Sequence, residues 1–458
     1  MAGDASTETM GAERAASGGH GDRLPVVIVG AGLAGLTAAV ALHEAGIPVH
    51  VFEASDGVGG RVRTDQHGDG FLIDRGFQVL LDAYPVARRW VDHAALDPQP
   101  FDAAALFWTG RRLVPLADPL RHPAGIARDL TASLFPASDK VRLARLALEA
   151  ATAPWESARE AALSLGQDVS ASELLWSRGF SERFVDRFAR PFWGGVTLDP
   201  YLAGSAGPLL FTLKMFLRGR AILPAGGVGA MPEQLRRRLP PEAVSLGARV
   251  TSVVIEDGRA TGVRVARRKM PAAAVIVATD PATAATLTHL PALAAAGEGQ
   301  PSVTVFLAGA RRPATGRRLV LDATRSMVIN HLAPLSEVQR GYAPEGQHLV
   351  AASIIGEAAG RGDLDALAEQ ARLDAAMMLG HAPGSWRVLE TVRVPFSQFA
   401  QPPGIYRRLP GNVTPTRGLV LASEATVDSS YNGAMLSGEA AAAIARRELA
   451  FRPELARN

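Results

Sequence analysis

The sequence contains no cysteine and very little lysine: of its 48 basic residues, only Lys140, Lys214 and Lys269 are lysines. The absence of cysteine excludes disulfide bonds, thiolate ligands for a metal and any cysteinyl link to a cofactor. The ten histidines are scattered, and none forms an HxxxH or HExxH pair, so we predict no metal site. A chain without disulfides is compatible with a reducing compartment. We expect it in the cytoplasm, with peripheral contact to a membrane left open.

Long apolar runs and dense basic blocks are also missing. No stretch approaches the roughly 18 apolar residues that a membrane-spanning helix needs. Residues 1–21 are small and polar and lack the apolar core of a secretory signal, so we expect 1–23 to be a disordered tail. The formal net charge is only +3 and no basic run is interleaved with aromatic residues, so we expect no nucleic-acid partner. With 458 residues, 47% of them hydrophobic, the chain is long enough for two or three domains.

The first motif is a strand followed by a glycine-rich turn and a helix. Val26–Val29 is a β-branched apolar run, which is typical of a buried parallel strand. Gly30, Gly32 and Gly35 follow at GxGxxG spacing. They permit a tight turn, the approach of a pyrophosphate to the backbone, and the packing of a helix on the strand. Residues 33–45 are rich in alanine and leucine and supply that helix, so this order predicts a dinucleotide site.

An acidic residue closes the second strand. Val49–Phe52 is again short and apolar, and Glu53 follows it directly. In dinucleotide-binding units an acid at this place accepts hydrogen bonds from the ribose diol. An unpaired carboxylate there would also repel a 2′-phosphate. The motif by itself does not distinguish NAD from FAD.

A second glycine cluster makes that distinction. Gly57, Gly59 and Gly60 are followed by Arg61, and Thr64 completes a GGRxxT sequence. Free backbone N–H groups and one guanidinium suit phosphate oxygens. The segment resembles the signature of the FAD-dependent amine oxidase, phytoene desaturase and protoporphyrinogen oxidase superfamily, with the desaturase-like branch nearest. In that superfamily it wraps the pyrophosphate and the arginine lies close to the flavin. The resemblance therefore implies non-covalent FAD.

Three further segments resemble the same superfamily. Residues 189–200, ARPFWGGVTLDP, are similar to its Pro-Phe-x-x-Gly-Val segment, and 223–235 are similar to its Pro-x-Gly-Gly segment. Residues 272–279, AAAVIVAT, are similar to a buried strand that faces the dinucleotide. The segment around Val250 is similar to a strand of the superfamily that holds the adenine edge, and the resemblance implies that the main chain of Val250 makes this contact. Trp193 is a candidate for the substrate channel, although packing in the core is at least as good an interpretation.

The last motif occupies residues 418–446. Leu419–Ala422 predicts a strand, and a helix is expected from Gly433 onward. The order Ser-x-Asn-Gly-Ala, then Ser-Gly, is similar to the terminal pattern of the superfamily. A helix N-terminus at this place directs unpaired N–H groups at the edge of the flavin ring, where the reduced ring carries negative charge. The superfamily usually has Gly-Asp before this loop, whereas this chain has Ser423 and Glu424.

Together these segments define the expected cofactor site. The glycine turn at Gly76 and Phe77 is predicted to contact the flavin, but a plain turn without any cofactor contact is an equally good interpretation. The pocket candidates beside the flavin are Tyr431, Trp193 and Phe77. The cofactor contacts that the resemblance implies are Gly30, Gly32, Leu33, Ala34, Gly35, Glu53, Ala54, Gly59, Gly60, Arg61, Gly76, Phe77, Val250, Thr279, Glu424, Asn432, Gly433, Ala434 and Met435.

The expected fold class is α/β. The resemblance implies a discontinuous Rossmann-like FAD-binding domain with a helical lobe and a mixed-sheet substrate domain. Three separate segments of the chain are expected to build the FAD-binding domain, at 24–100, 221–290 and 405–458. The helical lobe (101–220) and the substrate sheet (291–404) are expected between them.

Patterns outside the motifs predict the substrate-side elements. Ser138 is a natural N-cap for an amphipathic helix over 141–151. Lys214 is interpreted as a surface cation. Two apolar runs at 103–108 and 113–116, separated by a polar tip, predict a β-hairpin. Other apolar runs predict strands at 302–307, 319–321, 327–330, 348–355 and 387–394, and a helix at 364–379.

The resemblance implies hydride transfer from a substrate C–H bond to flavin N5, with oxygen or a quinone as electron acceptor. Amine oxidases of the superfamily commonly carry a lysine in the sheet lobe, and no lysine follows Lys269 here. Tyr431 offers one aromatic ring, but no second partner for an amine cage can be named. We therefore expect desaturation of a small apolar, isoprenoid- or carotenoid-like substrate.

Alternatives remain within and outside this chemistry. Amine oxidation and protoporphyrinogen-type oxidation are the alternatives within the superfamily. A flavin-dependent sugar mutase would need a nucleotide-sugar site, which the sequence does not indicate. A flavin-free binding protein resembling the GDP-dissociation inhibitors is disfavoured by Glu53 and the Gly-Gly-Arg sequence.

Overall fold

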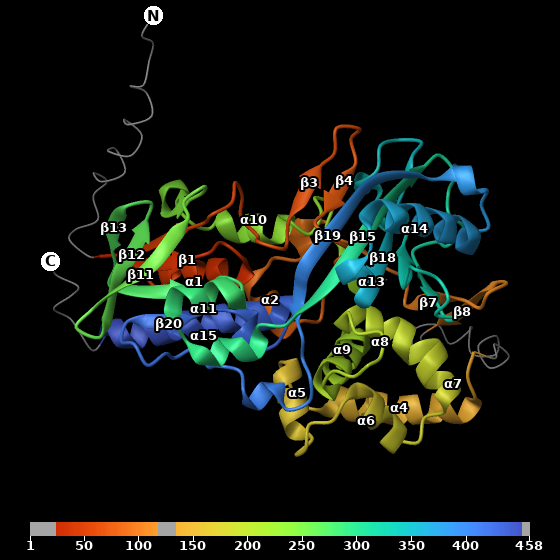
Figure 1. The fold of residues 1–458 in the computed structure, drawn as a ribbon, viewed down its shortest axis with the longest axis horizontal. Helices are drawn as coiled ribbons and strands as arrows, with labels where there is room; N and C mark the ends of the chain where they lie inside the picture. Colours follow the sequence, from red (N-terminus) through yellow and green to blue (C-terminus); the bar gives the residue numbers. More distant parts are fainter. Residues whose placement is uncertain (1–23, 118–133, 451–458) are drawn as a thin grey trace, which may run out of the picture.

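The computed structural model describes residues 24–117 and 134–450. The predicted tail at 1–23 lies outside the described residues, as does 451–458, the end of the third predicted FAD-binding segment. Figure 1 shows a domain built on a parallel sheet at the left, a second sheet at the upper right and a helical lobe below that sheet. The architecture is the α/β fold with a helical lobe and a mixed sheet that the sequence predicts.

A five-stranded parallel sheet forms the centre of the first domain. Its order is β10–β2–β1–β14–β20, so it joins three remote segments of the chain. The strands β1, β14 and β20 are buried throughout, as expected for parallel strands covered on both faces. The discontinuous Rossmann-like arrangement is therefore confirmed. The strands are β1 (Val26–Val29), β2 (Val49–Phe52), β10 (Val244–Ser245), β14 (Ala274–Val277) and β20 (Leu419–Leu421).

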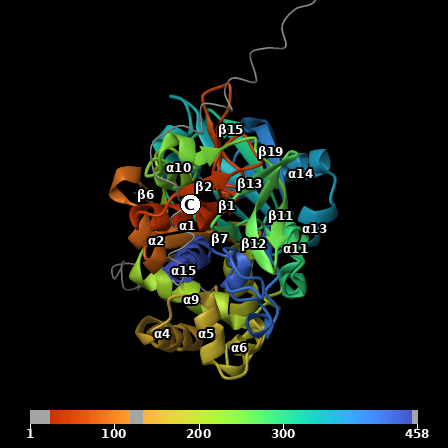
Figure 2. The same cartoon turned by 90° about the vertical axis from the view of Figure 1, so that its left-hand side faces the viewer.

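The first and the last helix of the domain pack against each other. Helix α1 (Leu33–Glu44) and helix α15 (Tyr431–Ala450) lie side by side in both Figure 1 and Figure 2. A Cβ atom at Gly438 would lie 2.2 Å from the carbonyl oxygen of Ala34, so only glycine permits this contact. The predicted C-terminal helix is confirmed, and the glycine of its Ser-Gly pair permits the close approach to α1.

A seven-stranded mixed sheet forms the substrate domain. Its order is β19–β15–β18–β17–β16–β7–β8, and all neighbours are antiparallel except β16 and β7. The strands are β7 (Ala104–Trp108), β8 (Leu113–Ala117), β15 (Gly299–Gly309), β16 (Leu319–Asp322), β17 (His331–Ala333), β18 (His348–Ile355) and β19 (Arg387–Phe399).

Two expectations for this sheet are corrected. The predicted strand at 327–330 is wrong: Asp322 accepts a hydrogen bond from the N–H of Met327 at 3.0 Å and holds this segment as a turn, so the strand begins at His331. Residues 104–117 were expected in the helical lobe (101–220). The predicted hairpin is confirmed as β7 and β8, but it lies at the edge of the second sheet, because β7 pairs in parallel with β16, some 200 residues later.

The helical lobe lies below the second sheet in Figure 1. Helix α7 continues through one π-helical stretch, Val185–Ala189, into α8. A π-helical turn of this kind often marks a functional region. The helices are α4 (Ala137–Thr152), α5 (Ala158–Ser164), α6 (Ala171–Ser177), α7 (Glu182–Phe184), α8 (Arg190–Thr197) and α9 (Ala206–Arg218).

Two residues of this lobe differ from their predicted roles. Ser138 is not an N-cap, because α4 already begins at Ala137, after Pro136. Lys214 is not a surface cation: it is 3% exposed, and its Nζ donates to the carbonyls of Ala153 and Trp155.

Trp193, a candidate for the substrate channel, lies in the core instead. It is 1% exposed, its indole N–H donates to Thr212 at 3.2 Å, and it packs against Phe188 and Phe192. The alternative interpretation of core packing is the one that fits.

The remaining elements connect and cover the two sheets. None of the helices in the described part of the chain combines the length and hydropathy that a membrane span requires. These elements are α2 (Pro85–Trp90), α10 (Ala230–Arg236), α11 (Pro281–Thr288), α12 (Leu335–Val338), α13 (Glu357–Arg361), α14 (Leu364–Leu379), β3 (Thr64–Gln66), β4 (Leu72–Asp74), β5 (Leu80–Leu81), β6 (Gln99–Pro100), β9 (Ala221–Leu223), β11 (Val250–Glu256), β12 (Arg259–Val265) and β13 (Arg268–Pro271).

Candidate cofactor-binding site

The glycine-rich turn after β1 is shaped for a ligand at one position only. A Cβ atom at Gly30 would lie 2.7 Å from the carbonyl oxygen of Ala278, and one at Gly35 would lie 2.0 Å from the carbonyl oxygen of Gly30. These two glycines therefore serve protein packing. Gly32 differs, because a Cβ atom there would meet nothing within 4 Å. The space above Gly32 is available to a bound group.

The N-terminus of α1 opens onto that space. No side chain caps it, and no acidic residue lies in its first turn. Among the described residues, the backbone N–H groups of Ala34 and Gly35 have no hydrogen-bond partner. Two free donors at the positive end of a helix suit an anionic ligand. The FAD pyrophosphate therefore fits this turn without displacing any protein contact.

Glu53 lies at the end of β2 beside the same turn. Its Oε2 accepts the N–H of Ala31 at 2.7 Å, and its Oε1 accepts the N–H of Ser55 at 2.8 Å. The Ser55 hydroxyl also donates to Oε1. A carboxylate offers about four acceptor positions, so Glu53 retains capacity for one further donor, such as a ribose hydroxyl.

Strand β11, which is predicted to hold the adenine edge, begins close to Glu53. The backbone N–H of Ala248 donates to the Glu53 carbonyl at 2.8 Å, two residues before Val250 begins β11. Thr279 follows β14, and its methyl group would lie 3.5 Å from a Cβ at Gly30. Both predicted contacts, Val250 and Thr279, thus lie around the dinucleotide turn.

The second glycine cluster lies directly against the first. The N–H of Gly59 donates to the Ala31 carbonyl at 2.8 Å, and Gly59 forms a β-bridge with Gly32. A Cβ at Gly60 would lie 3.7 Å from the Gly32 Cα, and Gly60 has a φ of +60°. The two glycine segments therefore border one space.

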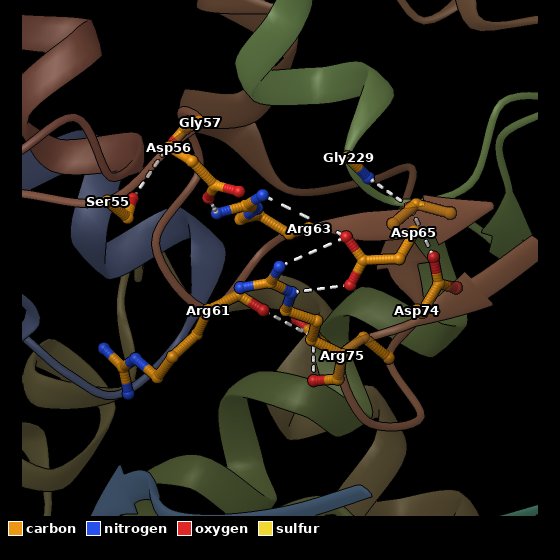
Figure 3. Close-up of polar contacts among 11 residues, drawn as sticks. Ser55, Asp56, Gly57, Arg61, Arg63, Asp65, Asp74, Arg75 and Gly229 are labelled. Carbon is orange, nitrogen blue, oxygen red and sulfur yellow. Dashed lines mark hydrogen bonds and ion pairs between the residues drawn. The ribbon is translucent and has the colours of Figure 1, made fainter. Parts of the chain in front are cut away.

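Arg61 points away from the other basic residues of its segment. Figure 3 shows Arg63 and Arg75 directed at Asp65, whereas the Arg61 side chain extends in the opposite direction. Its Nη1 donates to the Ser397 carbonyl at 2.7 Å, and its Nη2 pairs with Glu424 at 2.6 Å. Arg61 thus joins the first and third cofactor-binding segments to the end of β19.

The turn at Gly76 connects the two domains. Gly76 has a φ of +93°, which favours glycine. The N–H of Phe77 donates to the Thr304 hydroxyl of β15 at 3.0 Å. Gln78 donates to the Arg61 carbonyl at 2.9 Å and accepts the Tyr431 hydroxyl at 2.6 Å. Tyr431 and Phe77 therefore both lie at this turn, where the first domain meets the second sheet.

The loop before α15 is held by its own polar side chains. The Ser429 hydroxyl donates to Glu424 Oε2 at 2.5 Å. Asn432 accepts the N–H of Val86 and donates to the Glu156 carbonyl, so its side chain is engaged by protein partners. A Cβ at Gly433 would lie 2.4 Å from the Asp428 carbonyl. At Asn432 and Gly433, therefore, only the backbone is available to contact a cofactor.

Two more predicted contacts, Ala434 and Met435, lie in the first turn of α15. Met435 is fully buried and Ala434 is partly buried against the core. Met435 therefore supports the helix from behind. Ala434 belongs to the same N-terminal turn that faces the junction.

Asp74 is a buried site residue that sequence reasoning missed. Its carboxylate accepts the Thr64 hydroxyl at 2.5 Å, the Tyr342 hydroxyl at 2.8 Å and the N–H of Val228 at 3.1 Å. Thr64 in turn accepts the N–H of Gly229 at 2.9 Å. Burial raises the pKa of Asp74 to about 6. The Thr64 of the GGRxxT signature thus connects to the Pro-x-Gly-Gly segment.

Within the described residues, no cluster of three histidine or acidic side chains could hold a metal ion. The donors that converge on the site are backbone N–H groups and one guanidinium. This donor set suits phosphate and flavin rather than a cation.

Comparison with known proteins agrees with this geometry. The model of the family described as flavin containing amine oxidoreductase matches residues 33–445. The chain is 32% identical to hydroxyneurosporene desaturase of Cereibacter sphaeroides over 56% of each protein. It is 29% identical to protoporphyrinogen oxidase 2 of Arabidopsis thaliana over 38% of this chain and 33% of that one. The alignments thus span about half, or less, of these curated relatives.

The fold is shared with solved structures at lower identity. A putrescine oxidase double mutant superimposes with a TM-score of 0.70 and 19% identity, covering 93% of this chain and 99% of that one. An oxidoreductase from Methanosarcina mazei has the same TM-score and identity.

Proposed function

Since this chain belongs to the family of flavin-containing amine oxidoreductases, whose cofactor is FAD, we propose that it dehydrogenates an apolar, isoprenoid-like substrate. The substrate loses a hydride and a proton from adjacent carbons and gains a C=C bond. Molecular oxygen or a quinone then takes the two electrons. Contact with a membrane surface, where such substrates dissolve, belongs to the same proposal.

The observation that carries this proposal is the absence of lysine from the second sheet, together with the aromatic rings that pack where this sheet meets the helical lobe. Phe107 of β7 lies 5.6 Å from Phe188, ring centre to ring centre, and Phe188 stacks on Phe192 at 5.8 Å. The last lysine of the sequence, Lys269, pairs with Glu256 at 2.7 Å on the three-stranded sheet of the other domain. No ammonium group can therefore face the cofactor from the substrate sheet.

FAD, when bound, supplies the hydride acceptor for this reaction. The N-terminus of α1 binds its pyrophosphate, and Glu53 accepts a ribose hydroxyl. Arg61 and Glu424 hold the first and third cofactor-binding segments together, and the Gly76 turn orients the substrate domain against them.

Relatives support more than one substrate. The desaturase relative is named for hydroxyneurosporene and the plant relative for protoporphyrinogen. The desaturase alignment covers more of this chain, and the lysine-free sheet is not what we expect of an amine oxidase. Amine oxidation and protoporphyrinogen-type oxidation are therefore the alternatives that the experiment below distinguishes from desaturation.

Anaerobic stopped-flow bleaching of the holoprotein tests the proposal. We expect the flavin absorbance to fall with linear polyenes of isoprenoid origin, and to stay unchanged with primary amines and porphyrinogens. Bleaching by an amine or a porphyrinogen alone would replace the proposed substrate class. A colourless preparation that takes up no FAD would instead favour a flavin-free binding protein.

A further inference from the structure

A row of three polar side chains crosses the apolar substrate sheet. Thr304 of β15 pairs with Ser353 of β18, and Ser353 pairs with His331 of β17. Residues directly opposite each other in antiparallel strands project from the same face. Thr304, Ser353 and His331 are 2%, 5% and 6% exposed, so the row is enclosed.

Two members of this row have unused hydrogen-bonding capacity. Within the described residues, neither the Ser353 hydroxyl nor His331 Nε2 has a partner. The other ring nitrogen, Nδ1, lies 2.9 Å from Asn330 Oδ1. An amide oxygen can only accept, so Nδ1 carries the hydrogen and Nε2 presents a bare lone pair. Burial lowers the pKa of His331 to about 4, which keeps the ring neutral at physiological pH.

The row lies directly behind the turn that borders the cofactor. The backbone N–H of Phe77 donates to Thr304 at one end of the row, and the Phe77 ring lies 5.1 Å from the His331 ring at the other end. Phe77 therefore extends across Ser353. Its side chain is only half-buried, so protein does not fill all the space around it.

The opposite side of the row meets the helical lobe. A Cβ at Gly195 of α8 would lie 2.8 Å from Asn330 Oδ1 and 3.1 Å from His331 Nδ1, so this wall is closely packed. Asn330 also lines a cavity of about 140 Å³ together with Arg190, Asp322 and Arg325; His331 and Ser353 are not part of its lining. The polar row thus lies between the cofactor-side turn and the helical lobe.

An unpaired hydroxyl and an unpaired imidazole lone pair are costly in an apolar wall. A ligand hydroxyl satisfies both at once, because it donates to Nε2 and accepts from the serine. A carbonyl or carboxylate cannot donate, and a hydrocarbon satisfies neither. We propose that His331 and Ser353 bind a hydroxyl group of the otherwise apolar substrate. This inference rests on the proposed function and narrows it to a hydroxylated isoprenoid.

Ligand binding without turnover tests this assignment. Farnesol and farnesene, an isoprenoid alcohol and its hydrocarbon counterpart, are titrated into the holoprotein in one detergent, and binding is followed by the change in the flavin spectrum. We expect the alcohol to bind about tenfold more tightly or better, the scale of one or two buried hydrogen bonds. Ser353→Ala should lower this preference several-fold, and His331→Phe, which keeps an aromatic ring beside Phe77, should lower it similarly.

Thr37→Val is the matched control, because Thr37 of α1 carries an equally buried, unpartnered hydroxyl outside the substrate sheet. It should leave the preference unchanged, and Ser353→Thr should retain it. Equal binding of both probes by the wild type would overturn the proposal, as would an unchanged preference in Ser353→Ala; the row then holds a buried water only. An alcohol preference without bleaching by any polyene would overturn the proposed reaction and leave this binding site intact.

Discussion

Arg61 donates from Nη2 to Oε1 of Glu424 across 2.6 Å, although the two residues are 363 positions apart in the sequence. The Glu424 side chain is only 7% exposed, whereas that of Arg61 is 38% exposed. The pair fastens the loop before α15 to the second glycine cluster. Glu424 stands where the resemblance led us to expect aspartate, and its carboxylate reaches the guanidinium of Arg61.

The substitution Arg61→Ala should destabilise the protein by about 1–3 kcal/mol, because it leaves a mostly buried carboxylate without its partner. Urea unfolding of the apo-protein measures this effect without any contribution from lost cofactor. Arg63→Ala is the control: its partners Asp56 and Asp65 are 85% and 48% exposed, and we expect less than about 1 kcal/mol. If Arg61→Ala and Arg63→Ala cost the same, the pair with Glu424 has no special role. Adding Glu424→Gln to Arg61→Ala should recover some of the loss.

Gly32 should be the glycine at which a side chain removes the cofactor but not the fold. Gly32→Val places a branched side chain in the open space at the N-terminus of α1, where the pyrophosphate would bind. We expect a folded but colourless protein, measured by the ratio of flavin to protein absorbance and by circular dichroism. Gly384→Ala is the control, because a Cβ there also meets nothing within 4 Å. A fully yellow Gly32→Val protein would place the dinucleotide elsewhere.

The cofactor half of the fold could be predicted because its signals are local. The strand, the glycine spacing, the helix and Glu53 fall within 28 residues, and each constrains the backbone on its own. The structure forms β1, α1 and β2 as expected. The terminal motif was also recognisable from local sequence, because the close contact of α15 with α1 requires glycine at position 438.

The rest depends on contacts that sequence spacing does not reveal. The parallel pairing of β7 with β16 joins segments about 200 residues apart, so residues 104–117 gave no sign that they belong to the substrate sheet. The pairing of His331 with Ser353 is likewise set by the strand register. Lys214 was misassigned because a lysine is normally exposed, and only the structure shows the two carbonyls that accept its hydrogen bonds.

Lys214 should contribute to stability rather than to chemistry. Its ammonium donates to the carbonyls of Ala153 and Trp155, just past the C-terminus of α4, where a cation also interacts favourably with the helix dipole. Lys214→Met keeps the apolar stem and should lower the free energy of unfolding by about 1–3 kcal/mol. Lys269→Met, which removes a partly exposed pair with Glu256, should cost less than about 1 kcal/mol. Equal losses in the two variants would mean that Lys214 behaves as a surface residue.

Asp74 and His331 should give the folded protein two pH dependences of opposite sign. Burial raises the pKa of Asp74 from 3.8 to about 6, so its contribution to stability is greatest below pH 3.8 and falls by about 3 kcal/mol as the pH rises to 6. Burial lowers the pKa of His331 from 6.5 to about 4. Its contribution is greatest above pH 6.5 and falls by a similar amount as the pH drops to 4.

In the wild type these two contributions nearly cancel between pH 4 and 6.5, whereas single variants should separate them. Relative to the double variant with neither group, the free energy of unfolding of Asp74→Asn should fall as the pH is lowered through this range, because the contribution of His331 is no longer offset by Asp74. On the same comparison that of His331→Phe should rise as the pH is lowered, because the contribution of Asp74 is no longer offset by His331. Urea unfolding at several pH values measures both slopes, and the double variant, with neither group, provides the baseline. Parallel slopes in the two single variants would contradict the opposite signs, since burial of an acid and burial of a base shift proton binding in opposite directions.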